Sequence, residues 1–215
     1  MLKLTGLSLD LDFSGDDLKR AAAKRLGLPE QGIREVRLVK KSLDARKKEQ
    51  LHFVCAVEVS IEGKEARVLS RVRDQSVQRA VPYCYQLPES KPLSQPPVVI
   101  GFGPAGLFAA LILAQCGQRP LVLERGLPVK ERENSVKSFW EKGQLDPESN
   151  VQFGEGGAGA FSDGKLTTGT GDPRIRKVLE ELVRAGAPEE ILFEAKPHIG
   201  TDRLPGVVKA IREQI

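Results

Sequence analysis

The sequence predicts an α/β chain in two parts: a small α+β domain, then a domain built on a parallel strand–helix–strand unit. Three observations support this. Residues 2–59 contain stretches of period-two alternation, residues 82–97 are rich in proline, and a glycine-rich turn comes after the apolar run Val98–Ile100. With 215 residues the chain can hold one large domain or two small ones.

The first elements are a strand and a capped helix. Residues 2–9 alternate loosely between apolar and polar side chains, as a half-buried strand does. Ser14 or Asp16 can then cap a helix that continues to about Leu26, where Gly27 and Pro29 would end it.

Two further strands come after this helix. Residues 33–39 and 52–59 both alternate with period two, and residues 43–50 form a polar connection between them. The order strand, helix, strand, strand predicts a layer of helix on an antiparallel sheet.

A proline-rich passage marks the end of this domain. Such a passage sustains neither a helix nor a central strand, and the prolines concerned are Pro82, Pro88, Pro92, Pro96 and Pro97. We therefore place the boundary near residue 92, which gives domains of residues 1–92 and 93–215.

The second domain opens with a G-x-G-x-x-G turn, in which each glycine has a predicted task. Gly101 lets the chain turn sharply off the strand, Gly103 lets a pyrophosphate approach the backbone, and Gly106 lets the next helix pack close to the sheet. Pro104 suits a first helical turn because its missing N–H would have no partner there. The free N–H groups, including that of Ala105, would then face the phosphates.

The residues after the turn complete a Rossmann-like pattern. Residues 106–116 are apolar on nearly every face, as in a helix covered by other elements, and they are too few to span a membrane. Gly117 would end the helix, residues 121–123 form a second strand, and Glu124 stands where an acid binds an adenosine ribose. The alternative is a turn of this kind that binds nothing.

A second glycine cluster, residues 154–159, leads into a partial P-loop. Residues 159–165 match its first seven positions, but Leu166 stands where a Ser or Thr hydroxyl must hold magnesium, and no apolar strand precedes the loop. This argues against a nucleoside triphosphatase. The cluster could instead form a nest of backbone N–H groups beside a cofactor, or a plain flexible loop.

Two helices and one histidine are predicted in the last part of the chain. Residues 174–185 carry apolar side chains on one face and read as a packing helix, and residues 207–215 read as an amphipathic helix. His198 lies in an apolar, strand-like stretch, where a structural role and a role in proton transfer are both open.

Several of these segments resemble one family. Residues 99–106 with 123–126 are similar to the N-terminal FAD fingerprint of flavoproteins that bind two dinucleotides. Residues 139–168, together with 41–48 and 197–202, resemble a family of bacterial FAD-dependent dehydrogenases of the NAD(P)/FAD-dependent oxidoreductase type. The resemblance covers the whole chain. It implies FAD as cofactor, NAD(P)H as a candidate co-substrate, and these cofactor-binding residues: Gly101, Gly103, Pro104, Ala105, Gly106, Glu124, Arg125, Gly156, Gly157, Ser162 and Lys165.

Members of that family extend beyond the region of resemblance. They carry a later segment ending in Gly-Asp that meets the ribityl chain of the flavin, and this sequence has none. We therefore expect the chain to be the N-terminal part of a longer flavoprotein, with a truncated Rossmann-like domain.

Composition narrows the remaining classes. Cys55, Cys84 and Cys116 form neither a C-x-x-C pair nor a zinc pattern, which argues against a disulfide reductase and a metal site. The N-terminus has no apolar signal region, which predicts a cytoplasmic protein without a membrane partner. A basic hairpin could bind RNA phosphates, yet it carries no aromatic platform, and its basic residues are Arg34, Arg37, Lys40, Lys41, Arg46, Lys47 and Lys48.

The sequence thus predicts part of an FAD-dependent oxidoreductase, in which the flavin accepts a hydride or electron pair from a substrate that the sequence does not identify. Lys165 and His198 are candidates for a catalytic role, since both lie in the part expected near flavin or substrate. The alternative is a non-catalytic nucleotide-binding or RNA-associated module with structural FAD. The oligomeric state is not predicted.

Overall fold

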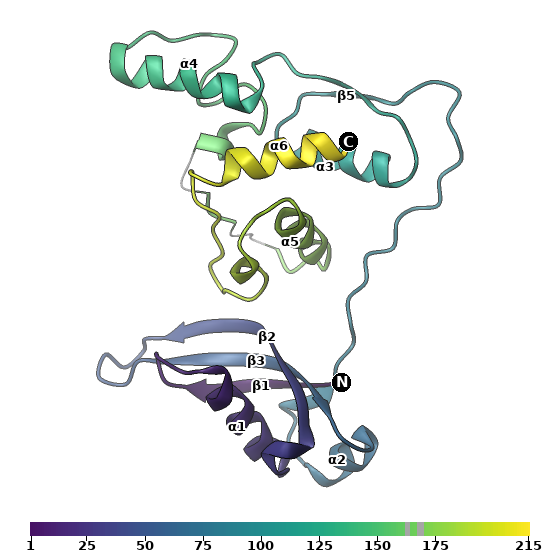
Figure 1. Cartoon of the computed structure of the whole chain (residues 1–215), viewed down its shortest axis with the longest axis vertical. Coiled ribbons are helices and arrows are strands. Elements are labelled where there is room, and N and C mark those ends of the chain that lie inside the picture. Colours follow the sequence, from purple (N-terminus) through teal and green to yellow (C-terminus); the bar gives the residue numbers. More distant parts are fainter. Residues whose placement is uncertain (162–163, 167–169) are drawn as a thin grey trace. The chain divides into compact units, whose positions relative to one another are not determined.

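The computed structural model describes residues 1–161, 164–166 and 170–215. Its contacts divide the chain into two compact units, Met1–Pro82 with Leu192–Ala195, and Tyr83–Ile191 with Lys196–Ile215. The chain is mixed α/β, with one antiparallel and one parallel sheet (Figure 1). The sequence placed a boundary near residue 92, whereas residues 83–92 belong by their contacts to the second unit.

The first unit is a four-stranded antiparallel sheet with two helices. Its strands are β1 (Leu2–Leu9), β2 (Ile33–Asp44), β3 (His52–Ile61) and β4 (Val77–Arg79), in the order β2-β3-β1-β4. Helix α1 (Gly15–Leu26) and the 3₁₀ turn η1 (Glu30–Gly32) connect β1 to β2, and α2 (Glu65–Arg71) connects β3 to β4. The predicted order strand, helix, strand, strand is confirmed, and α2 and β4 extend it to the β-α-β-β-α-β topology of ferredoxin-like folds.

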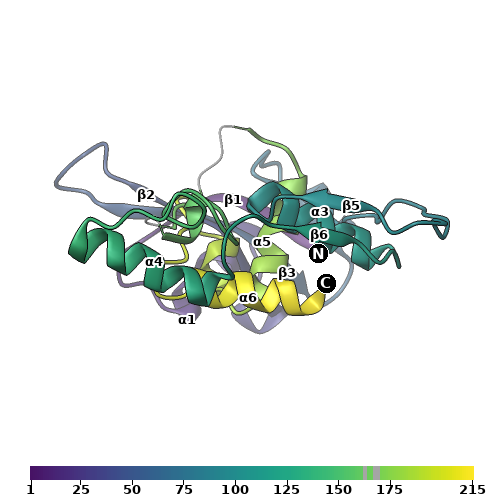
Figure 2. The same cartoon turned by 90° about the horizontal axis from the view of Figure 1, so that it is seen from above.

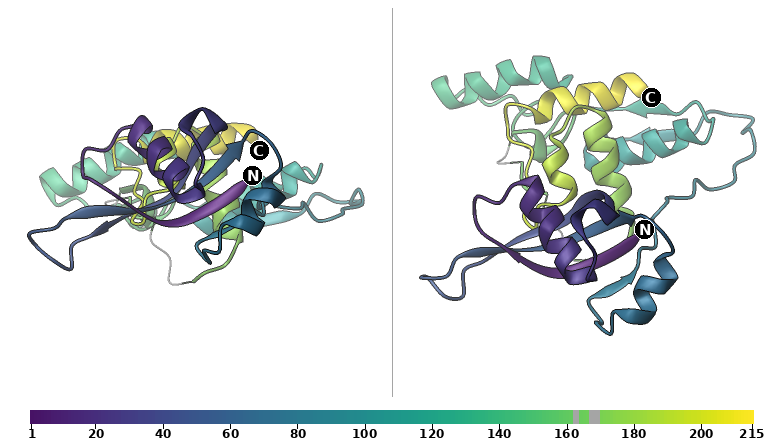
Figure 3. Two further views of the ribbon diagram at one scale, coloured as in Figure 1. Left: turned by 90° about the horizontal axis from the view of Figure 1, so that it is seen from below. Right: turned by 60° about the horizontal axis from the view of Figure 1, so that its bottom comes forward.

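The core of this unit lies between the sheet and its helices. Alternate residues of β1 are buried, and they form one cluster with Leu18, Ala22 and Leu26 of α1 and with Val68 of α2. Both views in Figure 3 show α1 lying along the sheet. The remaining β1 residues, such as Lys3 and Thr5, are exposed, as the period-two pattern requires.

Strand β2 is longer than the sequence indicated. Its alternation is broken where the register with β3 shifts between Leu38 and Lys40, and the strand continues beyond this irregularity to Asp44. The edge of β2 is also paired. Lys41 N–H donates to the Phe193 carbonyl at 2.7 Å, and Ala195 N–H donates to the Lys41 carbonyl at 2.9 Å.

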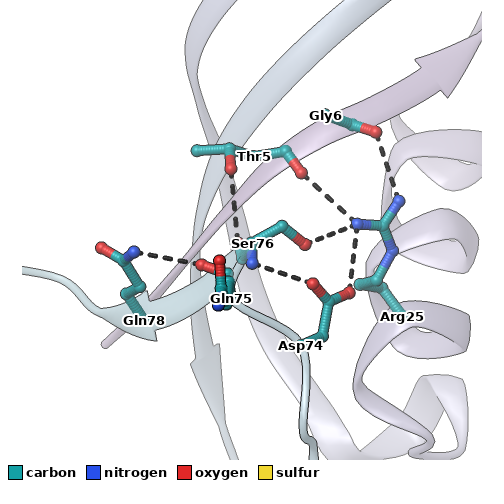
Figure 4. A network of polar contacts seen from close by, with 7 residues as sticks. All are labelled: Thr5, Gly6, Arg25, Asp74, Gln75, Ser76 and Gln78. Carbon is teal, nitrogen blue, oxygen red and sulfur yellow. Dashed lines mark hydrogen bonds and ion pairs between the residues drawn. The ribbon is translucent and has the colours of Figure 1, made fainter.

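An irregularity in β1 is held by an arginine of α1. Gly6 has a φ of +70°, between the two parts of β1 whose register with β3 shifts. The Arg25 guanidinium donates to the carbonyls of Thr5 and Gly6 at 3.4 and 3.2 Å and to Ser76 Oγ at 2.7 Å. Asp74 accepts from the same guanidinium, so one side chain joins α1, β1 and the turn before β4 (Figure 4).

The second unit contains the parallel strands β5 (Val98–Ile100) and β6 (Leu121–Leu123), joined by α3 (Pro104–Gln115). It continues with α4 (Val129–Lys142), η2 (Ala158–Phe161), α5 (Arg174–Arg184), η3 (Glu189–Leu192) and α6 (Leu204–Gln214). Helix α6 contacts three other helices of this unit, α3, α4 and α5 (Figure 2). The strands and the helices α3, α5 and α6 confirm the predicted elements, with α6 beginning earlier than expected.

The two faces of the parallel strand pair differ. Val99 and Val122 pack against the buried cluster that includes Leu107 and Leu111 of α3. The side chains of the opposite face are exposed, and they are Val98, Ile100, Leu121 and Leu123. Ile100 is the most exposed of these four residues, with 84% of its surface accessible.

Candidate functional site

The glycine turn between β5 and α3 has the geometry that its three glycines were predicted to allow. Gly101 has a φ of +88°, and its N–H donates to the Leu123 carbonyl at 2.7 Å, so the turn is tied to the end of β6. A Cβ on Gly106 would lie 1.9 Å from the Gly101 carbonyl oxygen. The first turn of α3 therefore packs so closely on the turn before it that only glycine fits at this position.

Gly103 occupies a different environment. It is the N-cap of α3, and a Cβ built on it would meet nothing nearer than Gly157 Cα at 3.9 Å. Pro104 and Ala105, the first two residues of the helix, are exposed. The N-terminus of a twelve-residue helix is thus open, with its positive dipole end facing accessible space.

Glu124 reaches back from the end of β6 to the turn. Its Oε2 accepts a hydrogen bond from Phe102 N–H at 2.6 Å, and its Oε1 accepts one from Gly126 N–H at 2.9 Å. Each carboxylate oxygen keeps a further lone pair for another donor. Arg125, the next residue, is exposed; its guanidinium lies over the Phe153 ring and 3.4 Å from Glu148.

The second glycine cluster packs directly on the first. Gly156 N–H donates to the Phe102 carbonyl at 2.8 Å, and a Cβ on Gly157 would lie 3.0 Å from Pro104 Cδ. Both glycines have positive φ. Because the N–H of Gly157 also donates within the protein, to Gly154 at 3.0 Å, these two amides do not form the predicted open nest. They contribute to the site through close packing.

A buried arginine of α4 holds this second loop in place. Arg132 is fully buried, and its guanidinium donates to five carbonyls at 2.7 to 3.3 Å, those of Asn150, Val151, Gly154, Glu155 and Gly157. It also lies over the Phe161 ring, 4.7 Å from its centre. Burial lowers the pKa of the Arg132 guanidinium, whereas the carboxylates of Glu124 and Glu155 act in the opposite direction.

A cavity opens at the carboxyl ends of β5 and β6, next to Glu124. It has a volume of about 370 Å³, and its lining includes Phe102, Val122, Glu124, Gly126, Glu155 and Arg212. The carboxyl edge of parallel strands is where ligands bind in open α/β sheets. Two carboxylates and one guanidinium therefore converge on a pocket whose other walls are largely apolar.

The two candidate catalytic residues lie opposite one another. Lys165 and His198 form an antiparallel bridge, supported by hydrogen bonds from Leu166 to Pro197 and from Ile199 to Gly164. Both residues are exposed. Ser162, the remaining predicted cofactor residue, lies outside the described residues.

Within the described part of the chain, four of the seven basic residues of the hairpin form ion pairs with acids, and these are Arg34, Arg37, Lys41 and Arg46. Arg37 pairs with Glu58, Arg46 with Asp44, and Lys41 with Glu194 at 2.9 Å. Phe53, its one candidate for stacking, packs edge-on against Phe13, and both rings are partly buried against the core. This environment does not favour base stacking, on which single-stranded nucleic-acid binding depends.

The described ranges hold neither a metal-binding cluster nor a membrane-spanning helix. Among residues 1–161, 164–166 and 170–215, no group of three or more His, Cys, Asp or Glu side chains is placed to hold a metal ion. None of the helices in those ranges combines the length and apolar character needed to cross a membrane.

Three residues of the site were not predicted from the sequence: Arg132, Glu155 and Arg212. Arg132 was detectable in principle, because it falls between Val129 and Val136 on the buried face of α4, where a charged residue is unusual. Glu155 lies among glycines, and no local pattern shows that its side chain is buried. Arg212 and Glu155 are joined only by the tertiary fold, 2.8 Å apart.

Comparisons with known proteins identify a family match and a related protein, and neither description names an activity. Residues 1–60 match a family described as a domain of unknown function (DUF8436). Over its full length the chain is 46% identical to an uncharacterized protein of Clostridium beijerinckii. The chain spans 40% of the length of that relative.

Proposed function

We propose that the chain binds the ADP half of FAD at the turn between β5 and α3. The main support is the contrast between two glycines. A Cβ on Gly106 would overlap the Gly101 carbonyl, whereas a Cβ on Gly103 would come no closer than 3.9 Å to another part of the chain, next to the exposed Pro104 and Ala105. A pyrophosphate would accept hydrogen bonds from this first helical turn, and Glu124 would accept hydrogen bonds from the ribose hydroxyls.

We further propose that the chain is part of an FAD-dependent oxidoreductase, as the family resemblance implies. When bound, the flavin would supply the chemistry of hydride or electron-pair transfer. The residues of this chain would bind and orient it. Arg132 would keep the loop at Gly156 and Gly157 against the glycine turn, and Lys165 and His198 are candidates for contact with flavin or substrate. NAD(P)H is a candidate co-substrate.

The test is ligand binding to two glycine variants. We expect the purified chain to bind FAD, followed by visible absorption, and ADP, followed by calorimetry. Gly103→Val should still fold, because its Cβ makes only an ordinary contact of 3.9 Å with Gly157 Cα, but it should lose both ligands, because its methyl groups would occupy the space where the pyrophosphate would lie. Gly106→Val should lose stability as well, since its Cβ meets the Gly101 carbonyl.

Circular dichroism and thermal unfolding provide the control for folding. If folded Gly103→Val binds FAD as the unchanged chain does, the pyrophosphate does not lie at this turn and the assignment is wrong. Failure of the unchanged, folded chain to bind either FAD or ADP contradicts the proposal outright.

A further inference from the structure

Glu155 is a buried acid with one unused oxygen. Only 2% of the residue is exposed. Its Oε2 accepts hydrogen bonds from Val129 N–H at 2.6 Å and from Arg212 Nη1 at 2.8 Å. Its Oε1 is also buried, and it has no hydrogen-bond partner among the described residues.

The hydrogen bonds to Val129 and Arg212 account for one oxygen of the Glu155 carboxylate, Oε2, and leave Oε1 unexplained. Val129 is the first residue of α4, so Oε2 caps a helix N-terminus and at the same time pairs with Arg212. Neither task needs the second oxygen. A desolvated carboxylate oxygen without a donor is costly, because buried polar groups that lack a partner lose their hydration without compensation.

The surroundings of Glu155 indicate where a donor could come from. Glu155 lines the same cavity as Glu124, at the carboxyl edge of β5 and β6. The volume of about 370 Å³ is at the lower end of the range for small-molecule pockets, which suits one nucleoside better than a whole dinucleotide. The apolar part of the lining, to which Pro128 and Ile215 contribute with Phe102 and Val122, suits a base.

We propose that Glu155 is a second acid of the ligand site, and that its Oε1 accepts a hydrogen bond from an O–H or N–H group of the adenosine moiety. This rests on the proposed function. Arg212 then acts as a positioning residue, because it holds Oε2 and so fixes the direction of Oε1. The site would recognise a nucleoside through two carboxylates from separate segments, Glu124 at the end of β6 and Glu155 in the second glycine cluster.

The variant for the test is Glu155→Gln, with ADP as the probe. The amide oxygen can keep the contacts to Val129 and Arg212, and this places an NH₂ group where Oε1 was. The O–H or N–H group of the ligand would then face the NH₂ group of the glutamine, which is also a donor, and could not form its hydrogen bond. We expect ADP to bind about 10- to 100-fold more weakly, as for the loss of a hydrogen bond to a charged group.

Two further variants separate recognition from structure. Glu213→Gln changes an exposed acid of α6 that pairs only with Lys209 among the described ion pairs, so it should bind ADP normally. Arg212→Gln removes the partner of Oε2 and leaves Oε1 chemically unchanged. It should weaken binding less than Glu155→Gln does.

The decisive measurement pairs Glu155→Gln with ADP analogues that lack the ribose 2′-hydroxyl, the 3′-hydroxyl or the adenine amino group. If Oε1 accepts from one of these donors, the analogue without it should bind the unchanged chain and Glu155→Gln equally well. A role confined to capping α4 would instead weaken all the probes by the same factor. That uniform loss, or no loss at all, overturns the proposal while ADP binding by the unchanged chain still supports the function. No ADP binding by the unchanged chain rejects both.

Discussion

At the scale of single residues, the site depends on charged side chains that are buried within it. Arg132 donates to five carbonyls of one loop, and Glu155 joins the start of α4 to Arg212 of α6. A guanidinium can satisfy several carbonyls at once because its five N–H groups lie in a fixed plane. The conformation of the second glycine cluster therefore depends on one residue of a different element.

Replacing Arg132 should disrupt this loop. Arg132→Met removes the guanidinium from five carbonyls. Those of Gly154 and Gly157 keep backbone donors, whereas those of Asn150, Val151 and Glu155 lose their described partner, and each buried acceptor that stays unpaired costs about 1–3 kcal/mol. We expect the free energy of unfolding to fall by at least about 3 kcal/mol, measured by urea denaturation. Arg132→Lys should recover only part of this loss, because an ammonium lacks the planar fork.

Lys130→Met is the matched control for Arg132→Met. Lys130 is exposed on the same helix, so its replacement should change stability by less than about 0.5 kcal/mol. Equal stability losses in the two variants would mean that the contacts of Arg132 do not hold the loop.

At the scale of elements, the ends of α1 show how local sequence sets a boundary. Ser14 Oγ accepts from Asp17 N–H at 3.2 Å, and the Asp17 carboxylate accepts from Ser14 N–H at 2.9 Å, which together form a capping box. Gly27 ends the helix in the left-handed conformation. Both ends were predicted because each depends on residues adjacent in sequence.

We expect Ser14→Ala to lower the free energy of unfolding by about 1 kcal/mol, the usual effect of losing an N-cap. It should also change the acid dependence of stability. The hydrogen bond from Ser14 is the main cause that lowers the pKa of Asp17. A carboxyl with a lowered folded pKa stabilises the protein above its unfolded pKa of about 4, and this contribution is lost as the pH falls through the folded value.

Thermal unfolding of both proteins between about pH 2 and 7 measures this effect. In Ser14→Ala the loss of stability below about pH 4 should be smaller than in the unchanged chain. Parallel curves for the two proteins would show that the capping box does not bias the ionisation of Asp17.

Elements defined by distant contacts were harder to predict. The pattern of β2 is broken at the irregularity between Leu38 and Lys40, so alternation alone ended the strand at Val39. Helix α4 was not predicted, because most of its residues are polar and one of its three buried positions is an arginine, so no apolar stripe is visible. The buried positions are Val129, Arg132 and Val136. The glycine turn was predicted residue by residue, since Gly101, Gly106 and Glu124 meet conditions that are local to one β-α-β unit. Glu155 and Arg212 meet only in three dimensions.

At the scale of the whole molecule, the two units differ in how completely they bury their apolar surface. The second unit leaves the face of Val98, Ile100, Leu121 and Leu123 exposed. Parallel sheets are normally covered on both faces. In the first unit, by contrast, the buried cluster is drawn only from residues 2–77, so its sheet and helices share a core within one continuous segment.

This contrast predicts that residues 1–82 fold without the rest of the chain. Leu192–Ala195 pairs with the edge of β2 but contributes no residue to the buried cluster. We expect the fragment to unfold in one cooperative transition and to protect the amides of β1 and β3 from hydrogen exchange, because these strands are central in the sheet. Protection at the free edge of β2 should be lower, since the hydrogen bonds to Phe193 and Ala195 are lost there. A fragment that is disordered, while the full chain is folded under the same conditions, would show that the first unit needs the second for its stability.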